Sequence, residues 1–185
     1  MRNTLDAALS NRTWDGDVAR ILMVVAPERF RDEELFDTRA VLEASGHDVA
    51  VASTRLGECP GSRGGHVSVD ALLSDQRSRD FDAVVFVGGG GCKLLWRDDD
   101  ALRLARDAAA DAKVLGAICL APVILANAGV LGGRRATVAG TEAGALEACG
   151  AIYTGPGVTV DGRIVTANGP KSSALFGRRI AELLG

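Results

Sequence analysis

The chain has 185 residues, of which 47% are hydrophobic and 24% charged, and its formal net charge is −3. This length is enough for one domain with a substantial core. The basic residues are dispersed, which excludes an extended nucleic-acid-binding surface. The four cysteines contain no Cys-x-x-Cys pair and exclude a dense disulfide scaffold, so we expect free thiols in a reducing cytoplasm.

The first residues differ in character from the rest of the chain. Residues 1–18 are polar and mixed, and we expect an N-terminal extension there, with a short helix at Leu5–Leu9. Residues 19–185 are expected to form a single domain.

Continuous apolar runs recur along this domain. Such runs are typical of strands that are buried on both faces of a parallel sheet. They predict strands at Ile21–Ala26, Val49–Ala52, Ala83–Val87 and Val114–Ile118. Helices are expected within residues 28–45, from Asp98 to about Asp111, from Pro122, from Glu142 to Ala148, and from Ser172 or Ser173 to about Leu184. Between them, Thr54–Asp70 predicts an excursion from the sheet as a small β-ribbon, Leu72 and Leu73 begin a poorly defined segment, and Ala136–Val138 predicts a short strand.

Near the C-terminus, Val158–Thr166 alternates around Asp161-Gly162, a strong signal for an antiparallel hairpin. The sum of these elements predicts an α/β fold: a doubly wound, mostly parallel sheet with helices on both faces and a late β-hairpin. Residues 114–133 contain no charged side chain, but Pro122 and several glycines interrupt them, which excludes a membrane span.

Cys119 lies between a predicted strand and a helix that starts near Pro122. A thiol on such a tight turn leaves the carboxyl end of the sheet beside unpaired backbone N–H groups, as the nucleophile does in α/β hydrolases. The helix dipole is expected to lower the pKa of the thiol and favour the reactive thiolate. The alternative is an inert buried cysteine, the commoner role of a free cysteine.

The neighbouring strand ends in the glycine run Gly88–Gly91. It is no phosphate loop, because Lys93 is followed by leucine and the glycine spacing is wrong. A glycine backbone here is instead suited to directing an N–H group at an oxyanion held over Cys119.

Several short motifs, taken together, resemble those of the ThiJ/PfpI family, also called the DJ-one superfamily. They are Asp32–Leu35, Gly46–Val49, Gly88-Gly89, Ala117–Cys119 and Thr166–Pro170, and the resemblance extends over about residues 20 to 184. It implies a flavodoxin-like sheet of the class I glutamine amidotransferase type, a homodimer or larger assembly, and a cysteine on the nucleophile elbow.

In this family a glutamate after the first strand shares a proton with the elbow cysteine, and motif matching places that glutamate at Glu34. Glu33 and Glu28 are nearby alternatives, and Glu34 could instead be a solvated residue at a helix start. The same matching makes the backbone N–H groups of Gly89 and Leu120 an oxyanion hole, and further residues are expected close to the site: Gly88, Gly90 and Cys92.

The chain departs from the family at its histidines. Many relatives have a histidine directly after the elbow cysteine, where this chain has Leu120, and others carry one on the strand after the elbow helix. Only His47 and His66 are present, and both are expected at the surface, with an approach of His66 to the site from this chain or a partner chain as the alternative. The sequence therefore disfavours a Cys–His pair and peptidase activity, and we expect no metal site.

The remaining pair, Cys119 and Glu34, favours a cofactor-independent reaction of the glyoxalase III or deglycase type on small reactive carbonyls. Two alternatives without catalysis remain open: a redox sensor with an oxidisable Cys119, and a chaperone-like dimer in which the thiol is incidental. An intracellular cysteine peptidase is the least favoured. The expected partners are a small carbonyl substrate or an oxidant and a second copy of the chain, with neither nucleic acid nor membrane.

Overall fold

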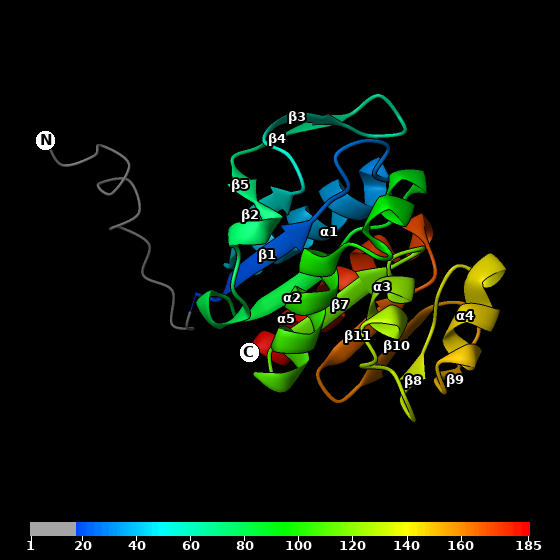
Figure 1. Ribbon diagram of the computed structural model, residues 1–185. Coiled ribbons are helices and arrows are strands. Elements are labelled where there is room, and N and C mark those ends of the chain that lie inside the picture. The colour runs from blue at the N-terminus through cyan, green and yellow to red at the C-terminus, as the bar shows by residue number, and fades with distance from the viewer. Residues whose placement is uncertain (1–17) are drawn as a thin grey trace, which may run out of the picture.

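The computed structural model describes residues 18–185. At its centre is a seven-stranded sheet (Figure 1). Its strands, in spatial order, are β10 (Val158–Asp161), β11 (Ile164–Ala167), β7 (Val114–Ile118), β6 (Ala83–Phe86), β1 (Arg20–Val24), β2 (Asp48–Ser53) and β5 (Ala71–Leu72). All neighbouring strands are parallel except β10 and β11, so the predicted doubly wound, flavodoxin-like fold with a late hairpin is confirmed.

Five α-helices surround the sheet: α1 (Asp32–Ala44), α2 (Asp99–Ala110), α3 (Pro122–Asn127), α4 (Ala143–Ala148) and α5 (Ser173–Leu184). Two further pairs of strands lie outside it, the antiparallel pair β3 (Gly57–Pro60) and β4 (His66–Val69) and the parallel pair β8 (Arg135–Ala136) and β9 (Ile152–Tyr153). Short 3-10 helices occupy Leu73–Asp75, Ser78–Asp80, Gly90–Leu95, Gly140–Glu142 and Pro170–Ser172.

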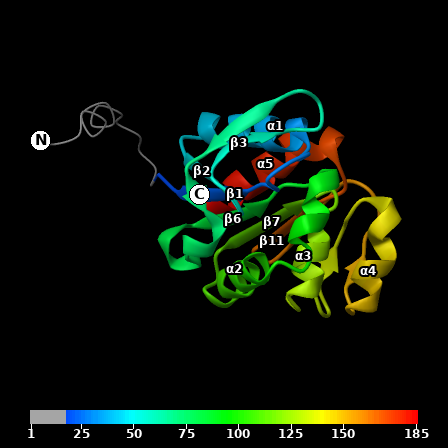
Figure 2. The same ribbon diagram turned by 45° about the horizontal axis from the view of Figure 1, so that its top comes forward.

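The helices form a layer on each face of the sheet. Helices α1 and α5 pack on one face, and α2 and α3 cover the other (Figure 2). Alternate side chains of β1 serve the two layers: Ile21 and Met23 belong to the core under α1 and α5, and Leu22 and Val24 to the core under α2 and α3. This double burial explains why the strands are continuous apolar runs.

Most predicted elements are present, with shifts at their ends. The ribbon expected in Thr54–Asp70 is β3 and β4, and the short strand near Ala136 pairs with β9. The hairpin register pairs Asp161 with Ile164, so its two-residue turn is Gly162-Arg163, one residue later than predicted. Ser172 precedes α5, but its hydroxyl bonds to Asn168 and caps no helix N–H.

Two predictions require correction. His47 was expected at the surface but is buried, and its Nδ1 accepts a hydrogen bond of 3.3 Å from the Ala19 N–H next to the start of β1. Ala71 and Leu72 form β5, an edge strand of the main sheet, where no clear element was predicted. The helix expected at Leu5–Leu9, and the extension over residues 1–17, lie outside the described residues.

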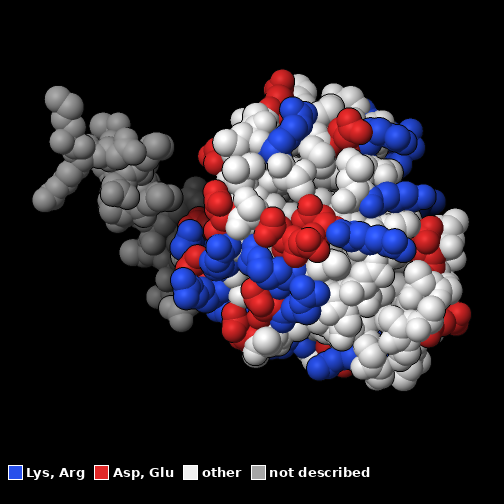
Figure 3. Space-filling model, viewed as in Figure 1, with Lys and Arg blue, Asp and Glu red and all other residues white. Residues whose placement is uncertain are grey.

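The surface carries both signs of charge. Figure 3 shows lysine and arginine side chains interspersed with acidic ones over the visible face. Within residues 18–185, no helix has the length and apolar character needed to span a bilayer.

Candidate active site

Cys119 occupies a sharp turn between β7 and α3. Its φ of +63° lies in the left-handed region that residues with side chains rarely adopt. The turn is held by the Cys119 N–H, which donates to the Ala167 carbonyl at 2.8 Å, and by the Ala121 N–H, which donates to the Ile118 carbonyl at 3.0 Å. Pro122 follows at the first position of α3. The half-buried thiol therefore leaves the carboxyl edge of the sheet on a strained elbow.

The structure brings Glu34 to this thiol. The first turn of α1 directs the carboxyl group inward, where it is fully buried. Its Oε2 accepts a hydrogen bond of 2.9 Å from the Gly88 N–H, at the end of the strand next to β7. Its Oε1 is buried and has no hydrogen-bond partner among the described residues, and the nearby Cys119 thiol lowers the pKa of the carboxyl group.

Gly88 is the reason that the two groups approach so closely. A Cβ at this position would lie 2.5 Å from Glu34 Oε2, 2.6 Å from the Ile118 carbonyl oxygen and 2.8 Å from Cys119 Cβ. Real side chains do not tolerate such distances, so any larger residue would push the carboxyl and the thiol apart.

Two backbone N–H groups face the sulfur, those of Gly89 and Leu120. Gly89 has a φ of +102°, and a Cβ there would collide with the backbone of Arg29 and Arg31. Only glycine therefore fits at position 89, where the chain after β6 passes the elbow. These donors are the pair expected from the family resemblance.

The charges of the site differ from the expectation. Burial raises the pKa of Glu34 from 4.5 to about 7. Burial also raises the pKa of Cys119 from 9.0 to about 12, and the adjacent Glu34 acts in the same direction, whereas the N–H groups of Gly89 and Leu120 lower it. The expected fall in the Cys119 pKa is therefore wrong, because desolvation and the like charge of Glu34 outweigh the backbone donors.

The two groups titrate together and hold one proton over much of the pH range. When that proton is on the sulfur, the buried carboxylate is charged. When it is on Glu34, the thiolate accepts hydrogen bonds from the carboxyl group and from both backbone donors. The same proton count thus includes a reactive form, a thiolate beside a carboxylic acid.

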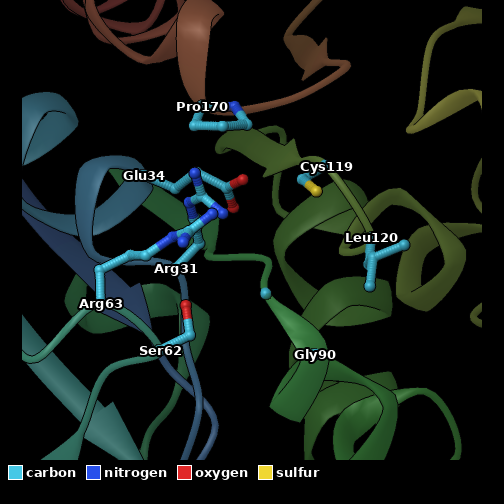
Figure 4. Close-up of a pocket in the computed structure, with 9 residues that line it drawn as sticks. Arg31, Glu34, Ser62, Arg63, Gly90, Cys119, Leu120 and Pro170 are labelled. Atoms are coloured by element: carbon cyan, nitrogen blue, oxygen red, sulfur yellow. The ribbon is translucent and has the colours of Figure 1, made fainter.

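A pocket of about 360 Å³ opens over the pair (Figure 4). Its lining contains Cys119, Glu34 and other residues from distant segments: Arg31, Ser62, Arg63, Gly89, Gly90, Leu120 and Pro170. The sequence reasoning missed Arg31, Ser62, Arg63 and Pro170. The one available signal was the glycine content of the β3–β4 turn, where Gly61 and Gly65 flank Arg63.

The alternatives and neighbours named from the sequence fall outside the reacting pair. Glu33 pairs with Arg31 at 2.7 Å, and Glu28 is exposed and does not line the pocket. Cys92 is buried in the core under α2 and α3, and burial raises its pKa, so it is an inert core thiol.

No imidazole lines the pocket. His47 lies at the opposite end of the sheet, beside Ala19, and His66 is exposed, 3.4 Å from the Glu58 carboxylate. Across the part of the chain that the structure describes, no group of three or more His, Cys, Asp or Glu side chains is placed to hold a metal ion.

Comparison with known proteins decides the family. The model of the DJ-1/PfpI family matches residues 19–183. The chain belongs to the DJ-1/PfpI family. Its relatives include an uncharacterized protein of Methanocaldococcus jannaschii, which is 43% identical over 169 residues that cover 90% of this chain and 82% of the relative.

Two further members of the DJ-1/PfpI family carry names that describe an activity. Deglycase PfpI of Pyrococcus furiosus is 32% identical over 89% of this chain and 99% of its own length. Glutathione-independent glyoxalase DJR-1.2 of Caenorhabditis elegans is 26% identical over 88% of this chain and 87% of its own length. Among solved structures, a ThiJ/PfpI domain protein of Brachyspira murdochii superposes with a TM-score of 0.88 at 36% identity, covering 91% of this chain and 98% of that one.

Proposed function

We propose that this protein converts small 2-oxoaldehydes to 2-hydroxy acids without glutathione or any other cofactor. The observation that carries the proposal is the buried Glu34–Cys119 pair, held around Gly88 at the floor of an open pocket. Relatives named deglycase and glutathione-independent glyoxalase support the same class of chemistry. Deglycation is a variant that begins with the same attack of the thiolate on a carbonyl carbon.

The reaction balances without an external oxidant or reductant. The Cys119 thiolate adds to the aldehyde carbon, and the new C–S bond turns the carbonyl oxygen into a hydroxyl of a hemithioacetal. A base removes the proton from that carbon while the ketone oxygen gains one, which gives an enediol. The hydroxyl on the first carbon then loses its proton and the second carbon gains one, so the first carbon becomes a thioester carbonyl and the second an alcohol. The resulting thioester is hydrolysed by water, releasing the 2-hydroxy acid and the thiol. The first carbon is oxidised and the second reduced, so only water is consumed.

Glu34 is the proposed proton carrier, because it lines the same pocket as Cys119 and its pKa of about 7 suits both giving and accepting a proton near neutral pH. The N–H groups of Gly89 and Leu120 are placed to hold the oxygen that gains charge when the thiolate adds. No histidine shares this work, so we expect a slow enzyme.

The test is a methylglyoxal assay with the purified protein in the absence of glutathione, with lactate as the measured product. We expect lactate from the wild type, and background levels from Cys119→Ser and Glu34→Gln. Cys149→Ser is the matched control, because this thiol donates to the Leu146 carbonyl on α4, away from the pocket, and its loss should leave the rate unchanged. Lactate formation by Cys119→Ser equal to that of the wild type would remove the mechanism.

A second candidate function is an oxidation sensor, because the thiolate form of Cys119 is accessible from the pocket while Cys92 is sealed in the core. Peroxide would transfer one oxygen to the thiolate, giving a sulfenate and water, and a second peroxide would give the sulfinate. Mass spectrometry after graded peroxide should find oxygen on Cys119 at doses that leave Cys92 unmodified. Equal modification of both thiols would argue against a sensor.

The remaining roles have less support. A cysteine peptidase commonly uses a histidine to protonate the leaving amine, and no histidine lines the pocket. A chaperone-like dimer would not need the Glu34–Cys119 pair at all. We keep the homodimer and the cytoplasmic location as proposals, and sedimentation of the purified chain tests the former.

A further inference from the structure

Arginine side chains form one wall of the pocket. Arg31 extends from the start of α1 and Arg63 from the β3–β4 turn, and both line the space over Cys119. Figure 4 shows both side chains on the side of the pocket across from Cys119 and Leu120. A third guanidinium, that of Arg29, lies beside Gly90, another lining residue, since a Cβ there would be 3.0 Å from one of its nitrogens.

The turn that carries Arg63 is fixed in place by a buried carboxylate. Asp32 accepts hydrogen bonds from the Arg63 N–H at 2.8 Å and from the Gly65 N–H at 2.6 Å. The Ser62 N–H adds a bond of 2.8 Å to the Phe30 carbonyl. These three bonds fix the backbone of the turn. They therefore fix the position of the Arg63 Cα, from which the side chain extends into the pocket.

The charge balance of this wall favours anions. Arg31 is paired with Glu33 through two hydrogen bonds, of 2.7 and 3.2 Å. Arg63 forms no ion pair within 4 Å among the described residues, although it lies near enough to Glu33 to lower the pKa of that carboxyl group. Its guanidinium makes no side-chain hydrogen bond there and remains available to a ligand. The opposing carboxyl group on the pocket floor, Glu34, is the one that keeps a proton to near pH 7.

The size of the pocket points the same way. Cavities of about 300 Å³ and more hold ligands much larger than methylglyoxal, which has only five non-hydrogen atoms. A molecule whose aldehyde carbon reaches Cys119 therefore has room for a further group, and that group would lie against the arginine wall.

We propose that the pocket selects molecules that carry an oxyanion, a carboxylate or a phosphate, beyond the carbon attacked by Cys119, and that Arg63 with Arg31 binds this oxyanion. As a statement about substrate this rests on the proposed function: the preferred substrate is an anionic 2-oxoaldehyde. The planar guanidinium matches either oxyanion through paired N–H donors. Arg63 and Arg31 are then specificity residues, and Asp32 positions Arg63.

The first experiment does not depend on turnover. Cys119 is alkylated with iodoacetate and with iodoacetamide, two reagents of nearly equal shape that differ in one negative charge. Both displace iodide to form the same kind of S–C bond, so the ratio of their rates within one protein reports the preference for an anion and cancels changes in thiolate content. Cys149 of the same protein is the internal reference.

We expect the rate ratio of iodoacetate to iodoacetamide to be higher at Cys119 than at Cys149. Arg63→Gln should lower it about fivefold, since one partly solvated charge pair has about that effect on an equilibrium. Arg63→Lys should keep most of the preference. Glu33→Gln should raise the ratio, because it frees the Arg31 guanidinium. Arg178→Gln removes an exposed arginine of α5 outside the pocket and should change nothing.

The second experiment compares turnover of 4,5-dioxopentanoate, 3-phosphooxy-2-oxopropanal and the neutral 2-oxopentanal. A higher kcat/KM for either anion, lost in Arg63→Gln while that for 2-oxopentanal is kept, supports the inference, and the better of the two identifies the oxyanion. Turnover of all three without preference, with an alkylation ratio insensitive to Arg63, overturns the inference and leaves the proposed function intact. If the alkylation ratio depends on Arg63 but no aldehyde is turned over, the anion site is supported and the proposed glyoxalase activity is refuted.

Discussion

Replacement of Glu34 by glutamine should change how the reactivity of Cys119 depends on pH. In the wild type the pair loses its first proton near pH 7, the pKa of Glu34, and the second only near pH 12, the pKa of Cys119. The rise of the Glu34 pKa from 4.5 to about 7 corresponds to about 3 kcal/mol against a buried carboxylate. Burial opposes charge on the sulfur as well, and the N–H groups of Gly89 and Leu120 offset part of that cost, so the singly ionised pair holds a fixed minor fraction of thiolate beside a protonated Glu34.

The assay is the rate of Cys119 alkylation by iodoacetamide from pH 5 to 9.5. In the wild type the rate should rise about tenfold per pH unit below pH 7 and become level above it, because the pair is then singly ionised. In Glu34→Gln the thiol titrates alone, so the rate should show no plateau at pH 7 and should still be rising above pH 8.5, the ordinary pKa of cysteine. Glu43→Gln, an exposed change on the same helix, should reproduce the wild-type profile. Coincident profiles for the wild type and Glu34→Gln would refute the shared proton.

Three further predictions concern stability and packing. First, the folded state keeps the Glu34 proton up to about pH 7, whereas the unfolded chain gives it up above pH 4.5. Between pH 4.5 and 7 the wild type should therefore lose about 3 kcal/mol of unfolding free energy relative to Glu34→Gln, as measured by urea denaturation. Parallel curves of unfolding free energy against pH for the two proteins would contradict this. Second, Gly88→Ala should destabilise by about 1–3 kcal/mol and suppress Cys119 alkylation, whereas Gly140→Ala, where a Cβ meets nothing within 4 Å, should do neither. Third, Asp32→Asn should lower the unfolding free energy by about 1–3 kcal/mol in thermal or urea unfolding, because the turn that carries Arg63 loses its anchoring carboxylate. It should also lower the ratio of iodoacetate to iodoacetamide rates at Cys119. A stable variant with an unchanged ratio would show that the anchor is dispensable.

The parts of the fold that sequence predicts are those with strong local patterns. Val114–Ile118 is apolar on both sides because helices cover both faces of β7, and this makes the strand evident. The two residues of β5 are too few for any periodicity, and only their pairing with Ala52 and Ser53 makes them a strand. His47 was wrongly expected at the surface. Its partner, the Ala19 N–H, is 28 positions earlier in the chain, and no local pattern indicates this contact.

The site divides in the same way. Cys119 and the segment that contains Glu34 follow apolar runs that end at one edge of the sheet, so topology predicts that they lie near each other, whereas the choice of Glu34 over Glu33 and Glu28 came from the family resemblance. Arg63 was not, because an exposed arginine in a glycine-rich turn resembles any solvated residue until Asp32 is seen to hold the turn. The direction of the Cys119 pKa was also missed, because burial is a property of the packed molecule and is invisible in one segment.

The left-handed backbone at Cys119 has a wider consequence. A side chain in that conformation works against folding, by about 1–3 kcal/mol for residues of this kind, and glycine would fit there without strain. At residue 119 stability therefore favours glycine, whereas the proposed reaction requires cysteine, and the chain has cysteine. Attempts to stabilise this protein by glycine should therefore use Ala112, which has a φ of +53°, and leave residue 119 unchanged, because the substitution that relieves its strain also removes the reactive sulfur.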